Sequence, residues 1–208
     1  VRKALDSFGF DATLCVLPDG EGHKTLATVR QLYDQLLAAD LDRSGIVVAL
    51  GGGVTGDIAG FAAATYMRGV RFVQIPTSLL AMTDASVGGK TGVNLSQGKN
   101  LVGAFKQPSL VFIDLDVLQT LPVVELRSGM AEVIKHAVIA DASLLEELTG
   151  TASLRPAAVT PELLARSIQV KIKVVEEDPF EKGRRAILNL GHTVGHALER
   201  LSAYDLRH

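Results

Sequence analysis

Hydrophobic residues follow two different spacings in the first 122 residues of the chain. Residues 12–16, 46–50 and 70–75 form short apolar runs rich in β-branched or aromatic side chains, which predicts strands. Residues 25–39 and 55–67 repeat their apolar positions at three- and four-residue steps, which predicts helices with one buried face. This alternation is typical of an α/β fold, and short connections between such units favour a parallel, doubly wound sheet.

The pattern changes twice further along the chain. Residues 78–105 are rich in Gly, Ser, Thr, Asn and Lys without a sustained period, so we expect an irregular segment of the kind that often carries function. Residues 110–113 offer one more strand. Beyond residue 122, helical spacing dominates in residues 130–139, 144–148, 161–177 and 187–201. We therefore predict an α/β domain over residues 1–122 and an α-helical domain over residues 123–208.

Composition and charge narrow the class of protein. Of the 208 residues, 47% are hydrophobic and 21% are charged, which is typical of a globular protein. The net charge of −2 predicts no nucleic-acid surface, and no uncharged run approaches the roughly 18 residues of a membrane helix. Cys15 is the single cysteine, so we expect a core thiol, no internal disulfide and a cytoplasmic location. The chain has no initiator Met and starts as if inside an amphipathic helix, so we expect a truncated start.

A glycine-rich turn follows the apolar run 46–50 and precedes an apolar helix. Residues 51–57 read GGGVTGD, and such glycines let backbone N–H groups approach an anion at a helix N-terminus. A dinucleotide pyrophosphate fits this geometry. The spacing differs from G-x-G-x-x-G, and the acidic residues placed for a ribose, Asp19 and Glu21, precede the glycines. A tight turn that binds nothing is the alternative.

A second glycine-rich segment carries lysines. Residues 83–94 read TDASVGGKTGVN and residues 98–100 read GKN, so that glycines separate two lysines, a carboxylate and asparagines. Lysines attract phosphate and carboxylate groups, Asn and Asp orient hydroxyls, and Arg68 can add a bidentate contact. We expect the segment to surround a small polyhydroxylated anion; a solvated surface loop is the alternative.

Two helical segments carry groups that can bind a metal. Helical spacing places Glu132, Lys135 and His136 on neighbouring turns, where a carboxylate and a cation can share a site. In residues 187–201, His192 and His196 stand together with Asn189 opposite an apolar face. Two histidines four residues apart, with a carboxylate from another helix, can hold a divalent ion and leave one position open. The spacing indicates Glu132, His192 and His196 as metal ligands, with His208 as a further candidate. Solvent-facing or capping histidines are the alternative.

Five motifs together resemble the 3-dehydroquinate synthases. They are GGGVTGD at residues 51–57, PTSLLAMTDASVGGKTGVN at 76–94, GKNLVGAF at 98–105, SGMAEVIKH at 128–136 and LNLGHTVGHALE at 188–199. The resemblance runs from residue 18 to residue 208. It implies a Rossmann-like NAD-binding domain, an α-helical domain that holds a divalent metal, an active site between them, and a homodimer.

The resemblance also implies roles for individual residues. It implies that NAD is contacted by Asp19, Glu21, Lys24, Gly53, Val54, Thr55, Gly56, Asp57, Thr77, Ser78, Lys90, Lys99, Val117, Leu118, Gln119 and Thr120. It implies that zinc or cobalt is held by Glu132, His192 and His208, which moves His196 to the substrate side. It implies that the substrate is met by Arg68, Asp84, Lys90, Asn100, Lys135, Lys171, Arg185, Asn189 and His196.

The activity implied by the resemblance is an NAD- and metal-dependent carbon–oxygen lyase reaction. In that family a seven-carbon sugar acid phosphate, 3-deoxy-arabino-heptulosonate 7-phosphate, is oxidised transiently, loses phosphate, is reduced again and closes to 3-dehydroquinate in the shikimate pathway. Lysines and Arg68 would stabilise the developing anions, and His196 and Asn189 would relay protons. This chain departs from the family pattern at Ser78, where a Thr is usual, and in the less acidic residues 178–183. It also stops at its own expected ligand, His208.

Three other functions share part of these motifs. A related cyclase that acts on sedoheptulose 7-phosphate would keep the glycine turn and the metal ligands. Iron-type alcohol and glycerol dehydrogenases lack the lysine-rich segment and would release NADH. A truncated, non-catalytic nucleotide-binding remnant would fold without turning over a substrate.

Overall fold

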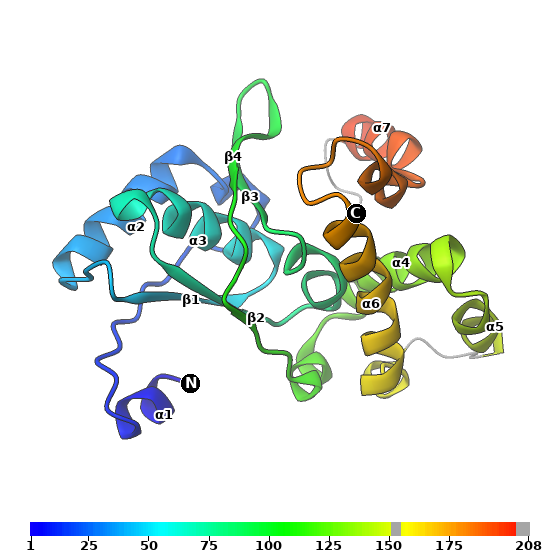
Figure 1. Ribbon diagram of the computed structural model, residues 1–208, viewed down its shortest axis with the longest axis horizontal. Helices are drawn as coiled ribbons and strands as arrows, with labels where there is room; N and C mark the ends of the chain where they lie inside the picture. Colours follow the sequence, from blue (N-terminus) through cyan, green and yellow to red (C-terminus); the bar gives the residue numbers. More distant parts are fainter. Residues whose placement is uncertain (151–154, 203–208) are drawn as a thin grey trace.

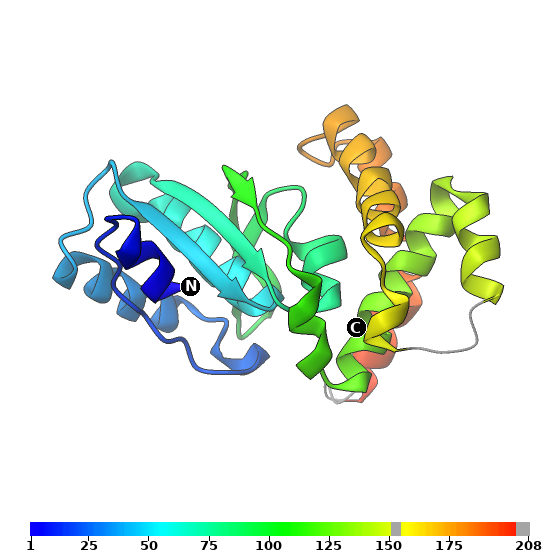
Figure 2. The same cartoon turned by 90° about the horizontal axis from the view of Figure 1, so that it is seen from below.

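The computed structural model describes residues 1–150 and 155–202 (Figure 1). A half that contains the parallel sheet and a helical half lie side by side in both views (Figure 1 and Figure 2). The first half contains α1 (Arg2–Ser7), α2 (Leu26–Ala38), β1 (Ile46–Gly51), α3 (Gly53–Thr65), β2 (Arg71–Pro76), β3 (Lys90–Leu95), β4 (Gly98–Phe105) and β5 (Leu110–Val111). The second half contains α4 (Val123–Ala140), α5 (Ala142–Gly150), α6 (Pro161–Glu177) and α7 (His192–Leu201). No described helix has both the length and the unbroken apolar run that crossing a bilayer would require.

The parallel sheet confirms the α/β prediction. Its strand order is β1-β2-β5, and β1 and β2 pair in parallel from Ile46 opposite Arg71 to Gly51 opposite Pro76. Helix α3 forms the connection between them and packs against both this sheet and the β3–β4 hairpin. The carboxyl end of β1 therefore opens directly into the glycine turn, which is where ligands bind in open α/β sheets.

The expectation of an irregular segment over residues 78–105 was wrong. A π-helix (Ala81–Ala85) is followed by the antiparallel hairpin of β3 and β4, in which Gly92 stands opposite Gly103. A Cβ added to Gly92 would lie 2.6 Å from the carbonyl oxygen of Val102, and one added to Gly103 would lie 2.3 Å from that of Thr91. These glycines allow two strands to approach closely, whereas in the sequence they indicated a loop.

The expected strand at residues 12–16 is not formed. Residues 11–18 have no regular structure, and in the described part of the chain the sheet contains only β1, β2 and β5. Cys15 and Leu17 pack against the first hydrophobic core, while Leu14 and Val16 are exposed. The alternation of packed and exposed side chains here therefore comes from contact with the core, and the backbone forms no strand pairing. Cys15 is partly buried, and burial raises the pKa of its thiol.

The single helix expected over residues 187–201 is two elements. A 3-10 helix (Arg184–Asn189) ends before Leu190, and α7 begins at His192. Between them Gly191 has φ +84°, a left-handed conformation that interrupts helical hydrogen bonding. The apolar face inferred for one continuous helix, and the shared face of Asn189 with the histidines, therefore do not exist as predicted.

Two hydrophobic cores stabilise the described chain. One is formed by α2, α3, β1 and β2 with Val93 from β3. The other is formed by α4, α5 and α6, together with Leu79, Met82 and Leu118. The second core thus recruits three residues from before residue 122, so the helical half is anchored on the segment that follows β2. The domain boundary near Val123 stays a prediction.

Candidate functional site

The glycine turn joins β1 to α3 at the edge of the parallel sheet. Gly52 caps α3, and residues 51–55 keep part of their surface open to solvent. A Cβ added to Gly56 would lie 2.7 Å from the side-chain oxygen of Gln74 on β2, so the first turn of α3 approaches the sheet more closely than another residue would allow. The free N–H groups at this helix start can contact an anion.

Lys24 connects the glycine turn to the β3–β4 hairpin. Its ammonium group is buried, with 4% of the residue exposed, and donates to Asp57 Oδ2 and to Asn100 Oδ1 at 2.5 Å each. Asn94 Oδ1 accepts from the Asn100 N–H at 2.8 Å, and Asn94 Nδ2 donates to Glu21 Oε1 at 2.8 Å. Burial raises the pKa of Asp57, and the charge of Lys24 opposes that rise. Five side chains from four segments thus form one network beside the turn.

The other residues expected to contact NAD lie in several places. Thr77 donates its N–H to the Gly51 carbonyl at 2.9 Å, and the Ser78 hydroxyl lies 3.6 Å from where a Cβ on Gly52 would stand. Asp19 is exposed in the loop before α2. Residues 117–120 belong to a 3-10 helix (Leu115–Thr120), and the Leu118 side chain is buried in the second core.

A buried charged cluster forms where the segment after β2 meets α4 and α6. Asp84 comes from the π-helix, Glu132 and Lys135 from α4, and Lys171 from α6. Lys171 Nζ donates to both the carbonyl oxygen and the Oδ1 atom of Asp84, at 2.6 Å each. Lys135 pairs with Glu132 on its own helix, and both side chains are more than nine-tenths buried. Two ion pairs therefore lie side by side, one fully buried and one in which the Asp84 side chain is 30% exposed.

An imidazole completes this cluster. His136 is fully buried, and its Nδ1 lies 2.9 Å from the Ser167 hydroxyl on α6. Burial lowers the pKa of His136 to about 4; Asp84 opposes this shift, and Lys135 and Lys171 add to it. Burial alone would raise the pKa of Asp84, but the lysines outweigh it and hold that pKa below its usual range. The cluster at neutral pH thus contains a neutral imidazole and an ionised Asp84 carboxylate.

The metal set expected from the resemblance is only partly described. Among residues 1–150 and 155–202, the group of three that could share an ion consists of Asp84, Glu132 and His136, whose ligand atoms lie within 4.8 Å of one another. His192 is half-buried at the start of α7, with Nδ1 3.4 Å from the Leu190 carbonyl oxygen, and is not in this group. His208 lies outside the described residues. The expected ligand set stays a prediction.

The remaining expected substrate residues gather around two loops. The guanidinium of Arg185 is buried and donates to the carbonyl oxygens of Pro179, at 2.7 Å, and Gly88, at 3.0 Å. Lys90 forms an ion pair with Glu181, whose Oε1 also accepts from Asn189 Nδ2 at 3.3 Å. The loop after β2 is therefore joined to the loop before α7.

Arg68 is not among the residues that make these contacts. Arg68 is exposed at the end of a 3-10 turn (Tyr66–Arg68) and has φ +67°. His196 belongs to α7, and its side chain is not described. Lys99 lies on β4, partly exposed beside Asn100.

Sequence reasoning missed several partners. Ser167 and Glu181 carry no motif that marks them as partners, and Gly88 lies in the lysine-rich segment without any sign of its contact, because each acts through a residue 31 to 97 positions away. His136 was noticed for its helical spacing, but nothing in the sequence indicated that its ring would face two carboxylates. No local signal could have found these partners.

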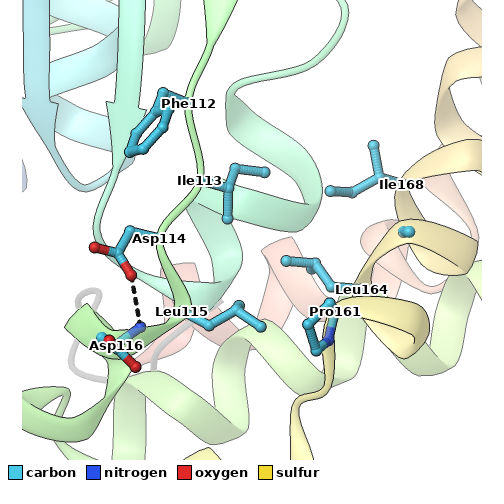
Figure 3. Close-up of a pocket in the computed structure, with 9 residues that line it drawn as sticks. Phe112, Ile113, Asp114, Leu115, Asp116, Pro161, Leu164 and Ile168 are labelled. Carbon is cyan, nitrogen blue, oxygen red and sulfur yellow. Dashed lines mark hydrogen bonds between the residues drawn. The ribbon is translucent and has the colours of Figure 1, made fainter.

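A separate apolar hollow of about 470 Å³ lies between the segment after β5 and α6 (Figure 3). Ile113 and Leu115 approach it from one side and Leu164 and Ile168 from the other. Asp114, at its rim, accepts a hydrogen bond from the Asp116 N–H at 3.0 Å. None of the residues expected to bind substrate or metal lines this hollow.

Comparison with known families covers most of the chain. Residues 14–128 match the family model described as 3-dehydroquinate synthase N-terminal, and residues 129–208 match 3-dehydroquinate synthase C-terminal. The 3-dehydroquinate synthase of Rippkaea orientalis is 55% identical over 210 residues, and that of Thermosynechococcus vestitus is 56% identical over 211. Each comparison covers 99% of this chain but 57% of the relative, so the chain spans little more than half the length of these proteins.

Solved structures with the same fold include two synthases with other names. The 2-epi-5-epi-valiolone synthase of Streptomyces hygroscopicus, with NAD⁺ and Zn²⁺ bound, is 33% identical with a TM-score of 0.91, covering 99% of this chain and 59% of that one. A 2-deoxy-scyllo-inosose synthase complexed with carbaglucose-6-phosphate, NAD⁺ and Co²⁺ is also 33% identical, with a TM-score of 0.80, covering 96% and 56%. A Schizosaccharomyces pombe glycerol dehydrogenase, 20% identical with a TM-score of 0.58 over 81% of this chain and 47% of that one, shares the fold alone.

Proposed function

The chain belongs to the 3-dehydroquinate synthase family, and we propose that the protein converts 3-deoxy-arabino-heptulosonate 7-phosphate to 3-dehydroquinate and phosphate. The observation that carries this proposal is the buried cluster in which Asp84, Glu132, Lys135 and Lys171 converge from three elements. The choice among cyclases rests on identity: the 3-dehydroquinate synthase relatives share 52–57% of residues, whereas the two other synthases named above share 33%.

NAD is the proposed cofactor at the glycine turn. Gly56 lets the first turn of α3 pack closely on β2, and the start of α3 offers N–H groups and a favourable dipole to a pyrophosphate. The network of Lys24, Asp57 and Glu21 supplies polar atoms beside that turn. Bound NAD supplies a reversible hydride acceptor. The protein's own contribution is to hold the bound cofactor in place through this network and the β3–β4 hairpin.

Zinc or cobalt is the proposed metal, held by Glu132, His192 and His208. A carboxylate oxygen and two imidazole nitrogens suit either ion and leave a position for the substrate. Within the described chain, Glu132 is buried and forms an ion pair with Lys135. A buried carboxylate that serves as a metal ligand needs such a cation partner when no metal is bound. When bound, the ion acts as a Lewis acid towards a substrate oxygen.

The chain's own residues would orient the substrate and stabilise its charges. Lys171 is fixed by two bonds to Asp84, which holds the carboxylate and the ammonium in one geometry. Lys90 is half-exposed beside Glu181, so it can turn to a phosphate or a carboxylate with little rearrangement. Preorganised ammonium groups of this kind lower the energy of anionic transition states. Asn189 and His196 are the proposed proton-relay residues.

We propose that the protein forms a homodimer and acts in the cytoplasm on a small sugar acid phosphate. Neither nucleic acid nor a membrane is a proposed partner, because the net charge of −2 gives no broad basic surface. Sedimentation of the purified protein tests the dimer.

The proposed activity is tested by measuring phosphate release from the heptulosonate phosphate and, in parallel, from sedoheptulose 7-phosphate. We expect release from the first substrate only, without accumulation of NADH, because the same cofactor takes and returns the hydride. Net NADH would favour a dehydrogenase, and release from sedoheptulose 7-phosphate would favour the other cyclase.

Glu132→Gln is the matched variant for this assay. We expect its rate to fall by at least about 100-fold while the fold is kept. Glu176→Gln on the exposed side of α6 is the control and should keep the full rate. If the Glu132 variant lost only stability, the protein would be a non-catalytic remnant.

A further inference from the structure

His136 has one ring nitrogen with a partner and one without. Its Nδ1 faces the Ser167 hydroxyl at 2.9 Å, and in the described chain its Nε2 makes no hydrogen bond although the residue is fully buried. A buried polar atom that makes no bond in one state commonly makes one in another state, because its desolvation is otherwise uncompensated. The function described above gives this histidine no role.

The groups that face His136 come from three elements. Asp84 belongs to the π-helix, Glu132 and Lys135 to α4, and Ser167 and Lys171 to α6. One ring nitrogen, one Asp84 oxygen and one Glu132 oxygen lie within 4.8 Å of one another. Since Nδ1 already contacts Ser167, Nε2 is the nitrogen available to the carboxylates.

The hydroxyl of Ser167 lies beside Nδ1 and can set the tautomer of the ring by donating to that nitrogen. Its only described side-chain bond is to His136 Nδ1, and a hydroxyl that donates there leaves the proton of a neutral imidazole on Nε2. With Ser167 as the donor, Nε2–H is itself a hydrogen-bond donor, and one oxygen each of Asp84 and Glu132 lies in the same 4.8 Å group as the ring.

We propose that His136 is a positioning residue for the Glu132 carboxylate, and that its Nε2–H replaces the Lys135 ammonium when that lysine turns to the substrate. The inference rests on the proposed function, in which Lys135 contacts the substrate and Glu132 contacts the metal. Glu132 is buried, so a hydrogen-bond donor that takes the place of Lys135 would keep its carboxylate compensated. One oxygen of Glu132 already lies within 4.8 Å of a ring nitrogen of His136.

Two substitutions in the complete protein separate this role from packing. His136→Phe keeps an aromatic ring and removes the donor, whereas His136→Gln keeps an N–H near the Nε2 position. We expect the Phe variant to lose about 10- to 100-fold in kcat and in Zn²⁺ or Co²⁺ affinity, with KM little changed. The Gln variant should recover most of both losses, and its melting temperature should not follow the recovery.

Ser167→Ala is a milder variant in case the Phe substitution prevents folding. It removes the group that fixes the proton on Nε2, so we expect a partial loss of metal affinity and kcat. Equal losses in the Phe and Gln variants, or unchanged metal affinity in both, would overturn the proposal. Complete loss of ion binding in the Gln variant, with a changed cobalt spectrum, would instead make His136 a direct ligand and also overturn it.

The metal measurement keeps the two proposals distinguishable. If wild-type protein releases no phosphate from the heptulosonate phosphate, the proposed function fails, while the Co²⁺ affinities of the His136 variants still test the positioning role. If wild type is active and Glu132→Gln is inactive, but His136→Phe matches wild type in both readouts, only the positioning role fails.

Discussion

The guanidinium of Arg185 donates a 3.0 Å hydrogen bond to the carbonyl oxygen of Gly88, 97 residues earlier in the chain. Arg185 is 2% exposed, and Gly88 has φ +100°. The contact joins the segment after β2 to the segment before α7. It therefore holds the lysine-rich motif next to the segment that leads into His192. A side chain on Gly88 would remove the space that the guanidinium occupies.

Gly88→Ala is therefore expected to destabilise the protein. An added Cβ would lie 2.3 Å from an Arg185 guanidinium nitrogen, and φ +100° is unfavourable for alanine, with a cost of about 1–3 kcal/mol for the backbone alone. Chemical denaturation measures the change in unfolding free energy. Gly195→Ala on α7 is the control: a Cβ there meets no atom within 4 Å, and we expect equal or higher stability. Equal behaviour of the two variants would contradict the structure at this contact.

Lys24→Met should weaken both stability and NAD binding. The substitution leaves Asp57 and Asn100 without the ammonium that joins them. Because the Asp57 side chain is still 20% exposed, the loss should be smaller than the roughly 3–5 kcal/mol of a fully buried pair. Calorimetric titration with NAD measures the binding change. Lys173→Met, an exposed lysine on α6, should leave the NAD affinity unchanged; a similar loss there would argue against a specific role for Lys24.

Asp141→Asn should lower stability in a pH-dependent way. Asp141 accepts from Arg166 at 2.8 and 3.1 Å, and these bonds, with those from Leu144 and Ser143, hold the pKa of its carboxyl below the usual range. A lowered folded-state pKa contributes stability that is complete above the unfolded value of about 4 and declines as the pH falls towards the folded value. Denaturant midpoints of both proteins should therefore differ at pH 7 and converge on acidification. A gap that widens in acid would refute the ion-pair account.

Removal of the metal should abolish activity and leave the helical half folded. The second core is made of apolar side chains such as Leu126, Val133 and Leu144, and none of these needs an ion to stay buried. After chelation we expect phosphate release to stop and the far-ultraviolet circular dichroism to remain. Added Zn²⁺ or Co²⁺ should restore the rate. Loss of helical signal on chelation would show that the metal is structural.

The strand-helix alternation in residues 46–75 was predictable because periodicity is a local property of the chain. The boundaries of α2 and β1 differ from the expected ones by a single residue at either end. The hairpin was not predictable, because Gly92 and Gly103 serve a close approach between two strands, and the same residue type is used in loops. The break at Gly191 was hidden for a similar reason: apolar residues at helical spacing, such as Ile187, Leu190 and Val194, persist across it.

By itself, the sequence determined the family, the order of the α/β and helical segments, and the types of side chain available for charge and metal chemistry. Those properties follow from motif identity and from periodicity, which short stretches of chain contain in full. Only the tertiary structure decided that Lys171 holds Asp84, that Ser167 and two carboxylates surround His136, and that Glu181 pairs with Lys90. Such pairings depend on how distant elements pack, because burial and distance between side chains are set by the whole fold.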